Sequence, residues 1–200
     1  MEHFNIRNIT TWIYRTMMLN ALFVLFSLPV ITMGAASTAS LSTVHYLRES
    51  GQDDIFRHFV MSFKMYFKPA TKVWSVLLIV VGMTVYNVLN FSPLGGIQSV
   101  LWMVQWPLLF QLVVVTIFVF AILSRFEVSS IRALKLAWII GNRNLLLSVG
   151  FIGAVVIGIE IGRYIPAINL FLLSGALHIL LDVMLDVSYK RIQLDLNLEA

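Results

Sequence analysis

The most visible pattern along the chain is a series of long apolar runs separated by short polar stretches. An α-helix rises 1.5 Å per residue and the hydrocarbon core of a bilayer is about 30 Å thick, so about 20 apolar residues suffice to cross it. Inside lipid no water satisfies backbone amides, and each run is therefore expected to be helical. The pattern predicts an all-α, polytopic membrane helix bundle with about five transmembrane helices, at residues 12–33, 71–91, 100–123, 145–162 and 165–187.

Residues 29–47 leave three courses open for the chain after the first run. Pro29 and Gly34 can break a helix, and every residue from 34 to 40 is small. The chain could cross once and continue as a second short helix, or it could turn back and leave the N-terminus inside. A cleaved signal peptide is the third course, because basic residues precede an apolar run that small residues follow.

Two stretches between the runs, residues 55–68 and 129–140, have apolar residues at helical spacing and basic residues on the other face. Ser129 is placed to cap the second stretch and Gly141 to end it. Both are predicted to be interfacial helices, and their equivalent basic positions indicate a weak parallel repeat. The candidate surface for lipid or a partner on the first stretch comprises Phe56, Arg57, Phe59, Phe63, Lys64, Phe67 and Lys68.

The basic residues indicate an orientation. With five crossings, 11 of the 14 Lys and Arg residues fall on one side of the membrane. Cytoplasmic loops carry the excess of positive charge, so this side is predicted to be the cytoplasm. A five-span protein of the cell membrane would then have its N-terminus outside and its C-terminus inside.

Composition agrees with one integral membrane domain over residues 1–200. Hydrophobic residues make up 59% and charged residues only 12% of the chain, whereas soluble domains average roughly a quarter charged. The absence of Cys excludes disulfides and thiolate chemistry. The net charge of +4 comes from residues beside apolar runs, which fits contacts to lipid headgroups and not to nucleic acid.

The last apolar run contains three ionisable residues, His178, Asp182 and Asp186, at intervals of four, so they lie along one helical stripe. Ionisable groups inside a span are costly and often functional, and the stripe could be a proton relay or a cation site. The alternative is a polar stripe that faces the bundle interior near the cytoplasmic end. No second helix offers an obvious further ligand, so no metal, cofactor or catalytic residue is predicted.

The fourth run carries small residues at every fourth position. Such a stripe lets another helix approach closely, either within the chain or in a homodimer. The predicted helix-packing face comprises Gly150, Ala154, Gly158 and Gly162.

Three segments resemble the YesL family of bacterial membrane proteins in order and spacing: L-N-A-L-F-V-L-F-S-L-P-V-I-T-M-G-A-A at residues 19–36, F-R-H-F-V-M-S-F-K-M-Y-F-K-P-A-T at 56–71, and S-R-F-E followed by R-A-L-K-L-A at 124–137. Ala121 departs from the family pattern, in which a Pro is expected, and this implies a straighter inner end of the third run. The family is a domain of unknown function, typically encoded near carbohydrate ABC importers, and it brings no catalytic residues.

The expected function is therefore an accessory or regulatory membrane component of carbohydrate ABC transport, with importer subunits as partners. A rival is a small-molecule or ion transporter that works alone or as an oligomer and uses the stripe on the last run. The chain lacks a phosphate-binding G-x-x-x-x-G-K-[ST] loop, a G-x-S-x-G elbow and an H-E-x-x-H motif, so it is not expected to be an enzyme.

Overall fold

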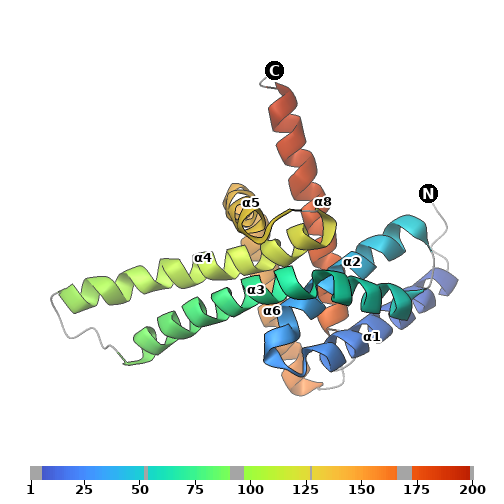
Figure 1. The fold of residues 1–200 in the computed structure, drawn as a ribbon, viewed down its shortest axis with the longest axis horizontal. Coiled ribbons are helices and arrows are strands. Elements are labelled where there is room, and N and C mark those ends of the chain that lie inside the picture. Colours follow the sequence, from blue (N-terminus) through green and yellow to red (C-terminus); the bar gives the residue numbers. More distant parts are fainter. Residues whose placement is uncertain (1–5, 52–53, 91–96, 127, 166–172, 199–200) are drawn as a thin grey trace.

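The structure of the chain, a computed structural model, describes residues 6–51, 54–90, 97–126, 128–165 and 173–198. These residues form helices and no strands, and Figure 1 shows how the helices are arranged. In chain order they are α1 (Ile6–Ser27), the short 3₁₀ helix η1 (Val30–Thr32), α2 (Met33–Ser50), α3 (Ile55–Asn90), α4 (Ile97–Arg125), α5 (Ser130–Arg143), α6 (Leu145–Tyr164) and α8 (Ser174–Leu198).

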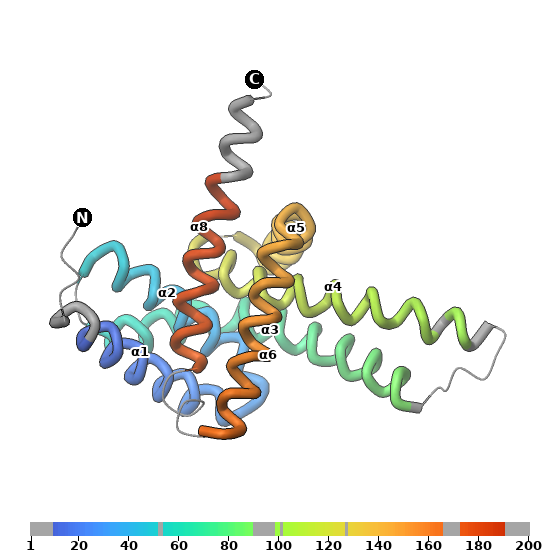
Figure 2. Tube along the Cα trace, turned by 180° about the vertical axis from the view of Figure 1, so that it is seen from behind, coloured from blue at the N-terminus to red at the C-terminus, as the bar shows by residue number. Residues whose placement is uncertain are grey.

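Helices α1 and α2 form a hairpin. Pro29 has an extended backbone (φ −76°, ψ 113°), and the Thr32 hydroxyl donates to the carbonyl oxygens of Phe26 at 2.6 Å and Pro29 at 2.7 Å. The chain then returns along α1, as both views show (Figures 1 and 2). At the open end, Arg15 Nη2 donates to the carbonyl of Gly51 at 3.1 Å. Residues 29–47 thus form a turn and most of a second helix, α2, which packs on α1.

The predicted boundary between an interfacial helix at 55–68 and a span at 71–91 is wrong, because α3 is one helix of 36 residues. Pro69 lies inside it and removes one backbone donor, which normally breaks or kinks a helix. Packing on both sides of the proline offsets this cost, since Phe59 is fully buried before it and Ala70 and Val73 are buried after it.

Helix α5 also differs from its prediction. Ser129 occupies the N-cap position, but its side chain makes no capping hydrogen bond. Gly141 was expected to end the helix, whereas α5 continues to Arg143. A Cβ at Gly141 would lie 2.5 Å from Val114 Cγ1, so this glycine serves the close approach of α5 to α4.

The core lies around the C-terminal half of α4, where Val114, Phe118, Val119 and Ile122 are fully buried. Helices α2, α3, α5 and α8 all pack against α4 and contribute residues to this core. The N-terminal half of α4 runs beside the end of α3 and diverges from α6 and α8 (Figure 2). The C-terminal ends of α2, α4 and α8 lie on one side of the molecule. The turn between α1 and α2 lies on the opposite side (Figure 1).

Three of the described helices are long and apolar enough to cross a membrane: residues 55–89, 102–125 and 145–164. They correspond to the second, third and fourth predicted runs. The first and fifth predicted runs are not matched in this way. Helix α1 carries Arg15 and Asn20 and ends at Ser27. The part of the fifth run that lies in α8 carries His178, Asp182 and Asp186, and residues 166–172 of that run lie outside the described part.

Candidate functional site

Two arginines and two aspartates from three helices meet in a network that we call the charged quartet. Arg48 comes from the last turn of α2, Arg125 is the last residue of α4, and Asp182 and Asp186 lie one turn apart on α8. Positions four apart on a helix share a face, so both carboxylates point to the same side of α8. The quartet therefore joins elements that are far apart in the sequence.

Each arginine binds both carboxylates. Arg48 Nη1 donates to Asp182 Oδ2 and, at 2.9 Å, to Asp186 Oδ2. Arg125 Nη2 donates to Asp182 Oδ1 and also, at 2.9 Å, to the backbone carbonyl of Asp182. Arg125 Nη1 donates to Asp186 Oδ1 at 2.5 Å. Charge-assisted hydrogen bonds of this kind are about twice as strong as neutral ones, and the arginine fork fixes their geometry.

Burial is uneven across the quartet. Asp182 is 1% exposed and Arg125 is 9% exposed, whereas Arg48 and Asp186 retain 30% and 32% of their exposure. Two positive and two negative groups sum to no net charge, so the network can lie in a low-dielectric region. A buried carboxylate left without its cation would instead carry a desolvation penalty of several kcal/mol. The Asp182–Arg125 pair thus forms the buried centre of the quartet.

His45 lies at the edge of the quartet. Its Nδ1 is 3.8 Å from Asp182 Oδ1, and its Nε2 is 3.3 Å from Glu49 Oε1. Glu49 is largely exposed, so this side of the network reaches solvent or headgroups. The quartet therefore has a buried end at Asp182 and an open end at the C-terminus of α2.

The predicted stripe of His178, Asp182 and Asp186 divides into two sites. Asp182 and Asp186 belong to the quartet, but the ring of His178 packs on Phe23 with centroids 5.0 Å apart. His178 Nδ1 lies 2.5 Å from the carbonyl oxygen of Ser174, one turn earlier on α8. The described residues hold no group of three or more His, Asp or Glu side chains placed to bind a metal ion.

Only some residues of the candidate surface on the first half of α3 are exposed. Phe59 is fully buried, and Phe63 is partly buried against Phe26 with ring centroids 4.8 Å apart. These two rings hold α3 against α1 and cannot contact a partner unless the two helices separate. The members that remain exposed are Phe56, Arg57, Lys64, Phe67 and Lys68.

The small-residue face of α6 is also divided. A Cβ at Gly158 would lie 2.4 Å from Leu173 Cδ1, and Gly162 is buried, so this end of the face is occupied by the chain itself. Gly150 has open space around it, and Ala154 is partly exposed. The first turns of α6 thus leave room beside the stripe.

Sequence reasoning missed the arginines of the quartet. The count of basic residues assigns Arg48 and Arg125 to the cytoplasmic side as topology signals, with no partner. One signal could have pointed to Arg125: two carboxylates one turn apart in an apolar helix need counter-charges, and this arginine stands directly after the third apolar run.

The described part of the chain defines an all-α protein with three helices able, by length and composition, to cross a bilayer. Residues 16–88 match the sequence model of a family described as Protein of unknown function, DUF624. The matched segment runs from α1 to the end of α3, so it includes Arg48 but not the other three members of the quartet. No curated protein and no solved structure matches the chain.

Proposed function

We propose that this protein is an accessory or regulatory component of the bacterial cell membrane, of the YesL type, that acts with carbohydrate ABC importers and is not itself a carrier. Two findings support the family assignment: the match over residues 16–88 and the resemblance of three segments spread over residues 19–137. The association with sugar import rests on that resemblance.

The observation that favours an accessory role over a carrier is the state of the two carboxylates. A cation carrier needs an ionisable group that can bind and release its cargo inside the membrane. In the charged quartet, each carboxylate oxygen of Asp182 and Asp186 already accepts a hydrogen bond from an arginine. A cation would have to displace Arg125, which is nearly buried. The quartet is better suited to hold α2, α4 and α8 together.

We further propose that both termini lie in the cytoplasm and that α1 and α2 enter the membrane as a hairpin. With this course and with α8 crossing, 13 of the 14 Lys and Arg residues lie on the cytoplasmic side, against 11 for a five-span course. This distribution agrees better than the five-span course with the rule that cytoplasmic segments carry the excess of Lys and Arg. The contact of Arg15 with Gly51 supports the hairpin course, because it joins the middle of α1 to the residue that follows α2.

The partner surface that we propose is the exposed part of α3 before Pro69. This helix of 36 residues is about 54 Å long, well beyond the hydrocarbon thickness of about 30 Å, so its first turns can project at the cytoplasmic face. They present Phe56 and Phe67 beside three basic residues. An apolar helix face with flanking charge is suited to a groove in a partner protein, and it could equally rest on lipid.

Affinity purification from native membranes in mild detergent tests the proposal. The full chain with a C-terminal tag is expected to recover importer permease or ATPase subunits in stoichiometric amount. The double variant Phe56→Ser/Phe67→Ser should lose them, whereas Ile131→Ser, which changes a more exposed apolar residue on α5, should retain them. Recovery of the protein alone, or only with itself, would contradict an accessory role.

A further inference from the structure

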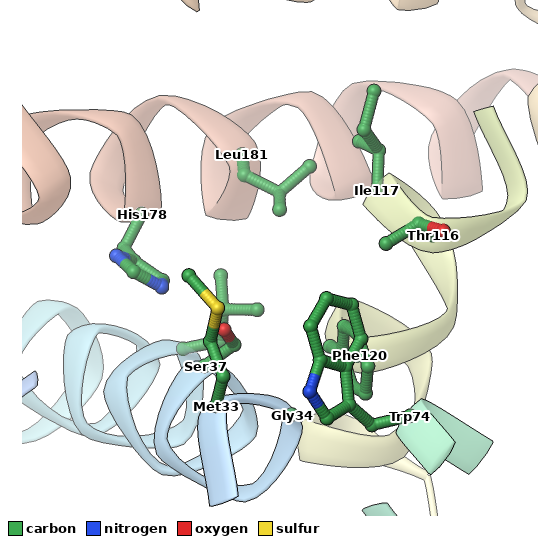
Figure 3. A pocket seen from close by; sticks show the side chains of 10 residues that line it. Met33, Gly34, Ser37, Trp74, Thr116, Ile117, Phe120, His178 and Leu181 are labelled. Atoms are coloured by element: carbon green, nitrogen blue, oxygen red, sulfur yellow. The ribbon is translucent and has the colours of Figure 1, made fainter. Parts of the chain in front are cut away.

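A cavity of about 200 Å³ lies where α2, α3, α4 and α8 meet (Figure 3). One wall is aromatic, because Trp74 and Phe120 stand edge to face with ring centroids 6.0 Å apart. Leu41 and Leu181 supply apolar surface from the two other helices. Dry apolar cavities of about 150 Å³ can hold benzene, so this volume is sufficient for a substituted ring of similar size.

The aromatic wall depends on a glycine. A Cβ on Gly34 would lie 2.6 Å from Trp74 Cβ and 2.9 Å from Phe120 Cε1. The indole of Trp74 is also fixed at its polar edge, since Nε1 donates to the carbonyl of Val30 at 2.7 Å. The wall is therefore positioned by contacts within the protein and does not need a ligand to hold it.

One side chain gives the cavity a directed polar group. The carbonyl oxygen of Ser174 can only accept a hydrogen bond, so His178 Nδ1, 2.5 Å away, must carry the proton. In a neutral imidazole the other nitrogen, Nε2, is then an acceptor. Figure 3 shows the ring of His178 reaching from α8 toward Met33 and Ser37 on α2, and among the described residues no side chain donates to Nε2.

Two hydroxyls also line the cavity, and that of Ser37 can donate or accept a hydrogen bond. The Thr116 hydroxyl donates its proton to the carbonyl of Leu112 at 2.7 Å and offers only lone pairs to the cavity. None of the described residues that line the cavity is Asp, Glu, Lys or Arg. A charged ligand would lose its hydration here without gaining a counter-charge, which costs far more than the transfer of a neutral molecule.

We propose that this cavity is a binding site for a small, neutral, phenol-type molecule, whose ring lies against Trp74 and Phe120 and whose hydroxyl donates to His178 Nε2. The ligand enters as a hydrophobic solute, and its single hydroxyl sets its orientation. His178 lies one turn from Asp182 along α8, and the cavity is lined neither by the charged quartet nor by the exposed residues of α3 before Pro69. The site is therefore separate from the proposed partner surface.

Binding of 4-fluorophenol and fluorobenzene to the full chain in lipid nanodiscs tests this site. The probe ligands differ by the hydroxyl alone, and ¹⁹F saturation transfer measures each against nanodiscs that lack the protein. A net hydrogen bond corresponds to roughly a three- to tenfold gain in affinity, so 4-fluorophenol is expected to bind at least about threefold more tightly. Equal binding of the two probes would overturn the role of Nε2.

Two variants separate the acceptor from the cavity. His178→Phe should remove the preference for 4-fluorophenol while fluorobenzene still binds, and Ser37→Leu should weaken both probes by partly filling the space. His58→Phe, a change on α3 at a histidine that does not line the cavity, should leave both affinities unaltered. Each variant is accepted only with a wild-type elution profile and helix content. Protein-dependent signals that Ser37→Leu leaves unchanged would overturn the site.

Discussion

Arg125, the last residue of α4, holds Asp182 of α8 by both its carboxylate and its backbone carbonyl, the latter at 2.9 Å. The two residues are 57 positions apart, and both are nearly buried. A guanidinium that binds backbone and side chain together fixes the rotation of α8 as well as its position. This contact makes the polar residues of the last apolar run part of the architecture.

Removal of Arg125 should destabilise the protein strongly. Arg125→Met leaves the buried Asp182 with a single cation, and the expected loss is about 3–5 kcal/mol, because one partner of a buried ion pair is removed. Thermal unfolding in detergent measures it. The double variant Arg125→Met/Asp182→Asn should lose clearly less than the sum of its two single variants.

A surface pair supplies the control for this cycle. Arg163 donates to Glu160 from a side chain that is 71% exposed. Exposed pairs contribute about 0–1 kcal/mol, so Arg163→Met should shift the unfolding temperature little. Equal effects of Arg125→Met and Arg163→Met would show that the quartet is not a buried network.

The two aspartates should differ in effect although both bind two arginines. Asp182 is 1% exposed and Asp186 is 32% exposed. Water can therefore replace part of the interaction with the arginines that a substitution of Asp186 removes. Asp182→Asn is therefore expected to lower the unfolding temperature more than Asp186→Asn. Added salt should reduce the decrease in unfolding temperature caused by Asp186→Asn. It should leave the decrease caused by Asp182→Asn almost unchanged, since buried pairs are screened less.

Gly175 should tolerate no side chain, because α8 approaches α1 too closely there. A Cβ at this position would lie 2.7 Å from the backbone oxygen of Thr16, which cannot move aside as a side-chain end could. Gly175→Ala should destabilise the protein by about 1–3 kcal/mol. Gly150→Ala is the matched control, since it has nothing within 4 Å and should be neutral or slightly stabilising. A reversed order in thermal unfolding would contradict this packing of α1 on α8.

The proposed cytoplasmic N-terminus can be tested by cysteine labelling, since the chain contains no Cys to give a background. An impermeant maleimide applied to intact cells should label Tyr164→Cys, at the outer end of α6, where the side chain is 85% exposed. Glu2→Cys and Arg132→Cys should react only after permeabilisation. Labelling of Glu2→Cys in intact cells would place the N-terminus outside and contradict the hairpin course.

Hydrophobic periodicity predicted the helices whose limits are set by their own composition. The runs at 100–123 and 145–162 lie within α4 and α6 with small shifts at the ends, and Pro107 inside α4 does not end that helix. The limits of α3 could not be predicted in the same way. Pro69 normally ends a helix, and only the burial of Phe59 before it and Ala70 after it, both tertiary effects, carries the helix through.

The site was predictable on one helix and not between helices. Four-residue spacing alone is sufficient to place Asp182 and Asp186 on one face of α8. Periodicity contains no information about which distant residue faces that stripe, so the pairing with Arg48 and Arg125 could not be derived. The same limit applies to His178, which shares the spacing but turns toward the cavity beside Phe23.

Cation flux into proteoliposomes tests the central claim most directly, namely that the charged quartet holds helices together and does not carry cargo. The purified protein is reconstituted with pH-, sodium- and potassium-sensitive dyes inside the vesicles, and an ionophore provides the full signal. We expect no flux above that of protein-free vesicles, because both carboxylates are bound by arginines. A protein-dependent flux that Asp182→Asn abolishes would contradict the account and identify the quartet as a transport site.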